Sequence, residues 1–151
     1  MKPLRSLLML CLVMVTITLT ACGGNVVKAP PTYTPEKIAA IERAIAPIEA
    51  VHDRMPELGN YVAAKDWNNI KSFLHGPLGG LRSTLGYLDR NLLLKKDQGE
   101  ATARAEALFA NIEQLDSAAS EQVGTIAQEV YGKTVADFDA YLEFIPHTPD
   151  A

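Results

Sequence analysis

Cysteine and positive charge are both scarce in this 151-residue chain. Its two cysteines are Cys11 and Cys22, and no cysteine follows Cys22. A domain built from the later residues therefore has neither a disulfide nor a cysteine-ligated metal. The net charge is −4, from 14 Lys and Arg against 18 Asp and Glu. Because nucleic-acid binding relies on clustered Lys and Arg, this acidic balance argues against a nucleic-acid partner.

The sequence also lacks the usual signatures of an enzyme. No serine lies in a Gly-x-Ser-x-Gly nucleophile motif, and no glycine-rich phosphate-binding loop is present. Asp137 and Asp139 stand without the further acidic positions and glycine of a calcium loop, so they fit an exposed helix surface better. We therefore expect a protein without catalytic activity.

The N-terminus has the layout of an export signal. Lys2 and Arg5 precede an apolar run over residues 7–19. That run is shorter than the roughly 20 residues of a membrane-spanning helix, which predicts a cleaved signal peptide over 1–21. The segment Leu-Thr-Ala-Cys at 19–22 resembles a bacterial lipobox, in which the cysteine is acylated and becomes the first mature residue. Cys22 is thus the predicted lipid attachment site, and loss of the two basic residues changes the charge from −4 to −6 (−4 − 2).

Residues 22–33 form a predicted tether between this lipid and a folded domain. After Cys22 the segment reads GGNVVKAPPTY, with glycines, prolines and no apolar periodicity. A flexible chain of this length reaches at most roughly 30 Å from the bilayer. The domain is therefore expected to stay close to a membrane surface.

The first half of the predicted domain, residues 34–146, has helical periodicity. Thr34 is a predicted N-cap with Pro35 in the first turn, and apolar residues then recur at steps of three and four up to Val62. We expect a bend at Pro47, with Pro56 as a second candidate.

A second helix is expected to begin after Asp66. Its apolar stripe is interrupted at residues 75–77 and resumes with leucines to position 92. Glycines at 76, 79 and 80 weaken this helix, each by about 1 kcal/mol relative to alanine.

The second half of the domain predicts two more helices. Asp97 and Glu100 have the spacing of a capping box at the start of a third helix. A fourth ends at Pro146, with Gly132 as a candidate break. No segment alternates like a half-buried strand. The predicted fold is all-α, an up-down-up-down four-helix bundle, followed by a C-terminal tail over 147–151.

Histidines suggest a possible metal site, but only weakly. Glu49-x-x-His52 has the spacing of a di-iron ligand pair, yet a bundle site needs two copies and the chain holds one. His52 and His75 remain candidate zinc ligands. The alternative is a structural histidine bonded to the backbone near a helix interruption.

Two other side chains are candidates for contact with a partner. Trp67 suits a core position or, as an amphipathic aromatic, an interface. Arg82 follows the weakened segment and is either a solvated charge or a forked donor to a partner carboxylate. Together with His75, these residues form the candidate partner interface.

Four segments resemble the cyanobacterial PsbQ-like lipoproteins, the CyanoQ family of photosystem II subunits. They are residues 33–38 (YTPEKI), Trp67 with 73–79 (FLHGPLG) and Leu81-Arg82, 115–119 (LDSAA), and 136–139 (ADFD) with Leu142. The segment HGPLG with its following Leu-Arg is the most specific of these.

This resemblance implies an extrinsic subunit on the lumenal side of photosystem II, anchored by lipid to the thylakoid membrane. Its implied partners are the manganese-stabilising extrinsic subunit and a core antenna protein. The implied role is to stabilise the oxygen-evolving complex and help retain calcium and chloride, with no cofactor required. A periplasmic metal-binding lipoprotein and a transient photosystem II assembly factor remain alternatives.

Overall fold

The computed structural model describes residues 31–148 of the chain. The predicted signal peptide, the Cys22 lipid site and residues 22–30 of the tether lie outside the described residues, as do the last three residues of the tail. No helix in the described part combines the length and the apolar character needed to cross a bilayer.

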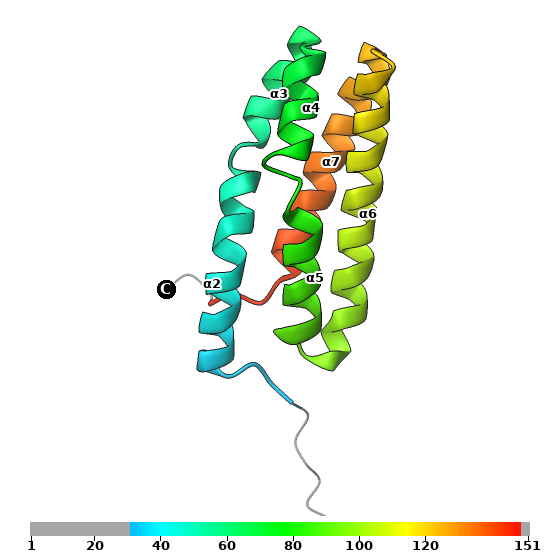
Figure 1. Ribbon diagram of the computed structural model, residues 1–151. Coiled ribbons are helices and arrows are strands. Elements are labelled where there is room, and N and C mark those ends of the chain that lie inside the picture. The colour runs from blue at the N-terminus through cyan, green and yellow to red at the C-terminus, as the bar shows by residue number, and fades with distance from the viewer. Residues whose placement is uncertain (1–30, 149–151) are drawn as a thin grey trace, which may run out of the picture. The chain divides into compact units, whose positions relative to one another are not determined.

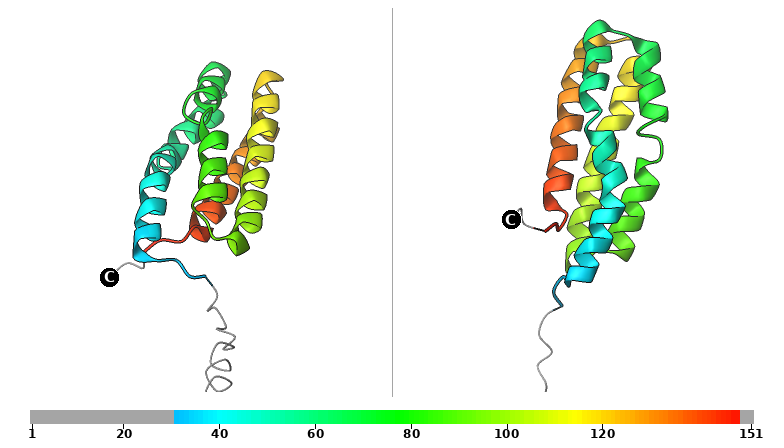
Figure 2. Two further views of the ribbon diagram at one scale, coloured as in Figure 1. Left: turned by 60° about the horizontal axis from the view of Figure 1, so that its bottom comes forward. Right: turned by 90° about the vertical axis from the view of Figure 1, so that its left-hand side faces the viewer.

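The described chain is all-α, as predicted, and its helices line up as four rods. The helices are α2 (Pro35–His52), α3 (Met55–Ala64), α4 (Trp67–His75), α5 (Leu81–Asn91), α6 (Lys95–Ser120) and α7 (Gly124–Phe144). Figure 1 shows α2 and α3 following one another along one rod, α4 and α5 returning along the second, and α6 and α7 forming the other two. The start of α2 and the end of α7 lie at the same end of the bundle (Figure 2).

The core is formed by the apolar stripes of all four rods. Its fully buried members include isoleucines of α2 and α4, leucines of α3, α5 and α6, and aromatic residues of α7: Ile41, Ile48, Leu58, Ile70, Leu85, Leu88, Leu108, Leu115, Phe138 and Tyr141. Residues three and four apart lie on one face of a helix, so the predicted periodicity accounts for this packing. Burial of such side chains, each worth roughly 1.5–3 kcal/mol, stabilises the bundle.

Two of the three predicted helix starts are confirmed. The Thr34 hydroxyl accepts a hydrogen bond from the Lys37 backbone N–H at 3.3 Å. The Asp66 carboxylate accepts one from the Asn69 N–H at 3.2 Å. These side chains satisfy backbone donors that the first helical turn leaves free.

The predicted capping box at Asp97 is wrong. The helix α6 begins earlier, at Lys95, and its N-cap is Leu94, whose side chain cannot accept a hydrogen bond. The hydroxyl of Tyr33 instead accepts from the Leu94 N–H at 3.1 Å and donates to the Asp97 carboxylate at 2.7 Å. A residue assigned to the tether therefore caps a distant helix and packs against the core.

The candidate break at Gly132 is wrong, whereas Pro47, where a bend was predicted, lies inside a continuous helix. The helix α2 continues through Pro47, which lies on its exposed side, where water can reach the carbonyl that loses its partner. The first rod breaks instead after His52, and α3 then begins with Pro56 in its first turn. Likewise, α7 passes through Gly132 without a break.

The interruption predicted between the two halves of the second rod is confirmed. The helix α4 ends at His75 and α5 begins at Leu81. A Cβ atom on Gly79 would lie 2.3 Å from the His75 carbonyl oxygen, and one on Gly76 would lie 2.7 Å from that of Ser72. Glycine is thus required here because the backbone approaches itself too closely for any side chain.

Candidate interaction site between α5 and α6

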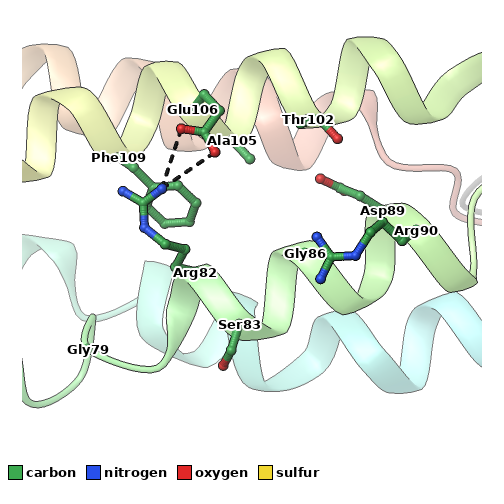
Figure 3. Close-up of a pocket in the computed structure, with 10 residues that line it drawn as sticks. All are labelled: Gly79, Arg82, Ser83, Gly86, Asp89, Arg90, Thr102, Ala105, Glu106 and Phe109. Atoms are coloured by element: carbon green, nitrogen blue, oxygen red, sulfur yellow. Dashed lines mark hydrogen bonds and ion pairs between the residues drawn. The ribbon is translucent and has the colours of Figure 1, made fainter.

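A hollow lies between α5 and α6. Its volume is about 500 Å³, and it is lined by Gly79, Arg82, Ser83, Gly86, Asp89, Arg90, Thr102, Ala105, Glu106 and Phe109 (Figure 3). Small residues from both helices therefore leave room between them. The hollow begins at the interruption in the second rod and runs along α5.

Arg82 links α5 to α6 at one end of this groove. Its guanidinium lies 4.1 Å from the ring centroid of Phe109 and donates to Glu113 at 2.7 Å. Both carboxylate oxygens of Glu106 lie 3.4 Å from its other terminal nitrogen (Figure 3). From the sequence, Arg82 was either a solvated charge or a donor to a partner carboxylate; in the structure both of its terminal nitrogens contact carboxylates of its own chain.

Asp89 is a buried carboxyl in the wall of the groove. Only 2% of its surface is exposed, and it accepts a hydrogen bond of 2.7 Å from the Tyr141 hydroxyl of α7. Burial raises the pKa of Asp89 above its ordinary 3.8, although hydrogen bonds from Tyr141 and Thr102 oppose the rise. Burial also raises the pKa of Tyr141, and the bond to Asp89 adds to that rise.

Arg90 occupies the other end of the groove and differs from Arg82 in its contacts. Its guanidinium folds back over Gly86, where an added Cβ would lie 2.9 Å from one terminal nitrogen. No Asp or Glu within residues 31–148 forms an ion pair with it. The two carboxylates of the groove are engaged elsewhere, because Asp89 accepts from Tyr141 and Glu106 pairs with Arg82, although the charge of Arg90 lowers the pKa of Asp89 slightly against the effect of burial.

The other two candidate interface residues are placed away from this groove. Trp67 begins α4 and packs, partly buried, against the core. A core position was one of the two alternatives that the sequence allowed for Trp67. His75 ends α4 with its side chain 69% exposed, and its Nε2 lies 3.2 Å from the Asp116 carboxylate of α6. His75 thus contacts a carboxylate, not the backbone.

The candidate zinc ligands do not come together. The Nε2 of His52 lies 2.6 Å from the Asp139 carboxylate of α7, and its ring stands edge-on to Phe138 at 5.0 Å. His75 pairs separately with Asp116 on α6. Among residues 31–148, no group of three or more His, Cys, Asp or Glu side chains is arranged to hold a metal ion. The described residues therefore do not fit a bundle metal centre.

Several residues of the site escaped the sequence analysis. Asp89 lies four residues after Leu85, so the spacing places its carboxyl on the apolar face of the helix. This spacing could have predicted a buried carboxyl. Arg90, Glu106 and Glu113 gave no signal, because exposed charges on a helix surface are common. Their pairing depends on the alignment of α5 with α6, which periodicity does not determine.

Two comparisons relate the chain to known proteins. The family model of PsbQ, described as oxygen evolving enhancer protein 3, matches residues 4–146. CyanoQ from Synechocystis sp. (strain ATCC 27184 / PCC 6803 / Kazusa) is 40% identical over 147 residues, which cover 97% of this chain and 98% of the relative. The similarity thus extends from the N-terminal segment to the end of the bundle.

Proposed function

This chain belongs to the PsbQ family, and from that premise we propose that it is an extrinsic subunit of photosystem II without catalytic activity. It would be anchored at the lumenal side of the thylakoid membrane, stabilise the oxygen-evolving complex and help retain calcium and chloride. The similarity to CyanoQ carries this proposal, because it covers 97% of this chain and 98% of the relative.

The surface of the bundle suits a subunit that acts by occupying a site. Among the described residues, the exposed large hydrophobic side chains are Tyr87 and Ile126. The remaining large apolar side chains are buried or half-buried, so we expect contact with a partner to be mainly polar. Such contacts fit an interface of standard or small size, below about 2,000 Å² of total buried surface. A subunit bound in this way covers its neighbours and slows the escape of small ions to bulk water.

The proposed membrane anchor is a lipid on Cys22. A tether of this kind raises the local concentration of the bundle at the membrane, so a moderate interface suffices for high occupancy. The proposed neighbours are the manganese-stabilising extrinsic subunit and a core antenna protein. Trp67, His75 and Arg82 remain the candidate contacts proposed from the sequence.

The test is oxygen evolution by photosystem II from cells that lack this protein. In media low in calcium and chloride, we expect photosystem II without this protein to lose more activity than photosystem II that contains the protein. Adding back the purified protein should restore the activity, whereas addition after heat denaturation should not. Equal activity of both complexes at every ion concentration would contradict the proposal.

A further inference from the structure

One exposed face of α5 combines an aromatic ring, an arginine without an ion-pair partner and an open groove. Tyr87 is 55% exposed, which is the larger exposure of the two large hydrophobic side chains that the described surface presents. Arg90 lies three residues further along the helix, so the two side chains emerge on neighbouring positions of one face. Arg90 and Gly86 line the groove beside them (Figure 3).

The contrast between the two arginines of the groove shows which one is free to bind. Arg82 is shared between Glu106 and Glu113 and stacks on Phe109. Arg90 forms no ion pair with any residue from 31 to 148. A new acceptor can therefore reach Arg90 without displacing a carboxylate of this chain.

The Arg90 guanidinium lies against the helix surface at Gly86, where the glycine leaves room for it. The planar fork of an arginine is pre-organised, so it loses less conformational entropy per hydrogen bond than a lysine ammonium does. The guanidinium can therefore make a two-point hydrogen bond to a carboxylate.

We infer that Tyr87, Arg90 and the groove beside them form a docking surface for a protein that presents a carboxylate. This inference rests on the proposed function, so the partner is a lumenal protein of photosystem II. Charge complementarity selects an acidic contact, since the free group at this edge is a cation although the chain as a whole carries −4. Tyrosine and arginine are also the residue types that contribute most to binding at interfaces.

The position of Arg90 supports this choice of partner. It lies in the last turn of α5, and Figure 1 shows that α5 ends at the same end of the bundle at which α2 begins. In the proposal the tether joins the bundle at that end, so this surface lies at the end of the bundle that is linked to the lipid. Arg90 also suits the negative end of the helix dipole, but lysine serves that role equally well.

The experiment measures binding of the purified full-length mature protein to photosystem II from cells that lack it. We expect Arg90→Glu and Tyr87→Ala each to weaken binding by about tenfold or more. Arg90→Lys should lose part of the affinity, because lysine keeps the charge but not the forked geometry. Circular dichroism of each variant, matching the wild type, ensures that the loss is not due to unfolding.

Matched control variants carry the same changes on other faces of the bundle. Arg43→Glu reverses an exposed arginine of α2 that also forms no ion pair within the described residues. Ile126→Ala removes the other exposed large hydrophobic side chain. Both should bind within about twofold of the wild type if the surface is specific.

The outcomes separate this inference from the proposed function. If the wild type binds and Arg90→Glu binds equally well, or if Arg43→Glu loses as much, the docking surface is wrong while the function stands. If the wild type itself does not bind, the proposed function fails, and the inference fails with it. A dimer of the wild type that Arg90→Glu abolishes, with photosystem II binding retained, would assign the surface to a second copy and overturn the proposed partner.

Discussion

At the scale of single residues, the two arginines of the groove differ in whether they form ion pairs within the described part of the chain. The Arg82 guanidinium connects α5 to two carboxylates of α6, whereas Arg90 has no such partner among the described residues. A single exposed ion pair of this kind contributes at most about 1 kcal/mol. Arg82 therefore helps to align two helices, and Arg90 is the group that can respond to a partner.

Asp89 gives a prediction for the dependence of stability on pH. Its pKa is raised in the folded state, so the folded protein holds this proton more tightly than the unfolded chain does. The stabilisation is fully present below the unfolded pKa of 3.8 and is lost as pH rises through the folded pKa. Asp89→Asn removes this pH-dependent loss of stability, because the amide does not titrate, while its oxygen can still accept a hydrogen bond from the Tyr141 hydroxyl.

The measurement is urea unfolding of the wild type and Asp89→Asn from about pH 4 to pH 8. We expect the stability of the variant relative to the wild type to increase with pH. Parallel curves, or a wild type that gains stability relative to the variant as pH rises, would contradict a buried carboxyl with a raised pKa.

At the scale of helices, local chemistry determines where most elements begin and end. The caps at Thr34 and Asp66 and the interruption after His75 follow from residues within one turn, and the sequence predicted all three. The cap of α6 could not be predicted in this way, because its acceptor is Tyr33, which lies far away in the chain. Gly132 does not break α7, because a glycine inside a helix costs only about 1 kcal/mol relative to alanine, which packing along the rod overcomes.

The same distinction applies to the candidate site. The sequence identified Arg82 and the weakened segment before it, since glycine and proline mark an irregular backbone. It did not identify Glu106 and Glu113, whose contacts with Arg82 span 24 and 31 residues. Contacts across such separations depend on the register between packed helices, which requires the structure.

The segment between α4 and α5 gives a prediction with an internal control. Gly79→Ala places a Cβ 2.3 Å from a backbone oxygen, whereas Gly80→Ala meets no atom within 4 Å. We expect Gly79→Ala to lower the free energy of unfolding by about 1–3 kcal/mol, because backbone cannot move aside as a side chain can. The change for Gly80→Ala should stay within about 0.5 kcal/mol. Denaturant midpoints that fall equally for both variants would refute the close approach.

At the scale of the whole molecule, the bundle and its proposed anchor have separate roles. The four rods form a closed core, and the described surface exposes Tyr87 and Ile126 as its large hydrophobic side chains. The start of α2 lies at the same end of the bundle as the end of α7 (Figure 2). The anchor would bring this body to the membrane, and the docking surface would select its neighbour. The two contributions can therefore be removed one at a time.

Cys22→Ser removes the proposed lipid without changing the bundle. We expect the variant to move from the membrane fraction to the soluble fraction and to occupy fewer photosystem II complexes, because its effective concentration at the membrane falls. Its circular dichroism and unfolding free energy should match those of the unmodified domain. Full membrane retention and normal occupancy of the variant would show that another part of the chain holds the protein in place.

The most direct test of the central claim is whether the native protein isolates with photosystem II from detergent-solubilised thylakoids. The account predicts that it copurifies with complexes that evolve oxygen, in a fixed ratio to the core subunits. Recovery only with immature, inactive complexes would assign it to assembly instead. Recovery entirely apart from photosystem II would contradict the account.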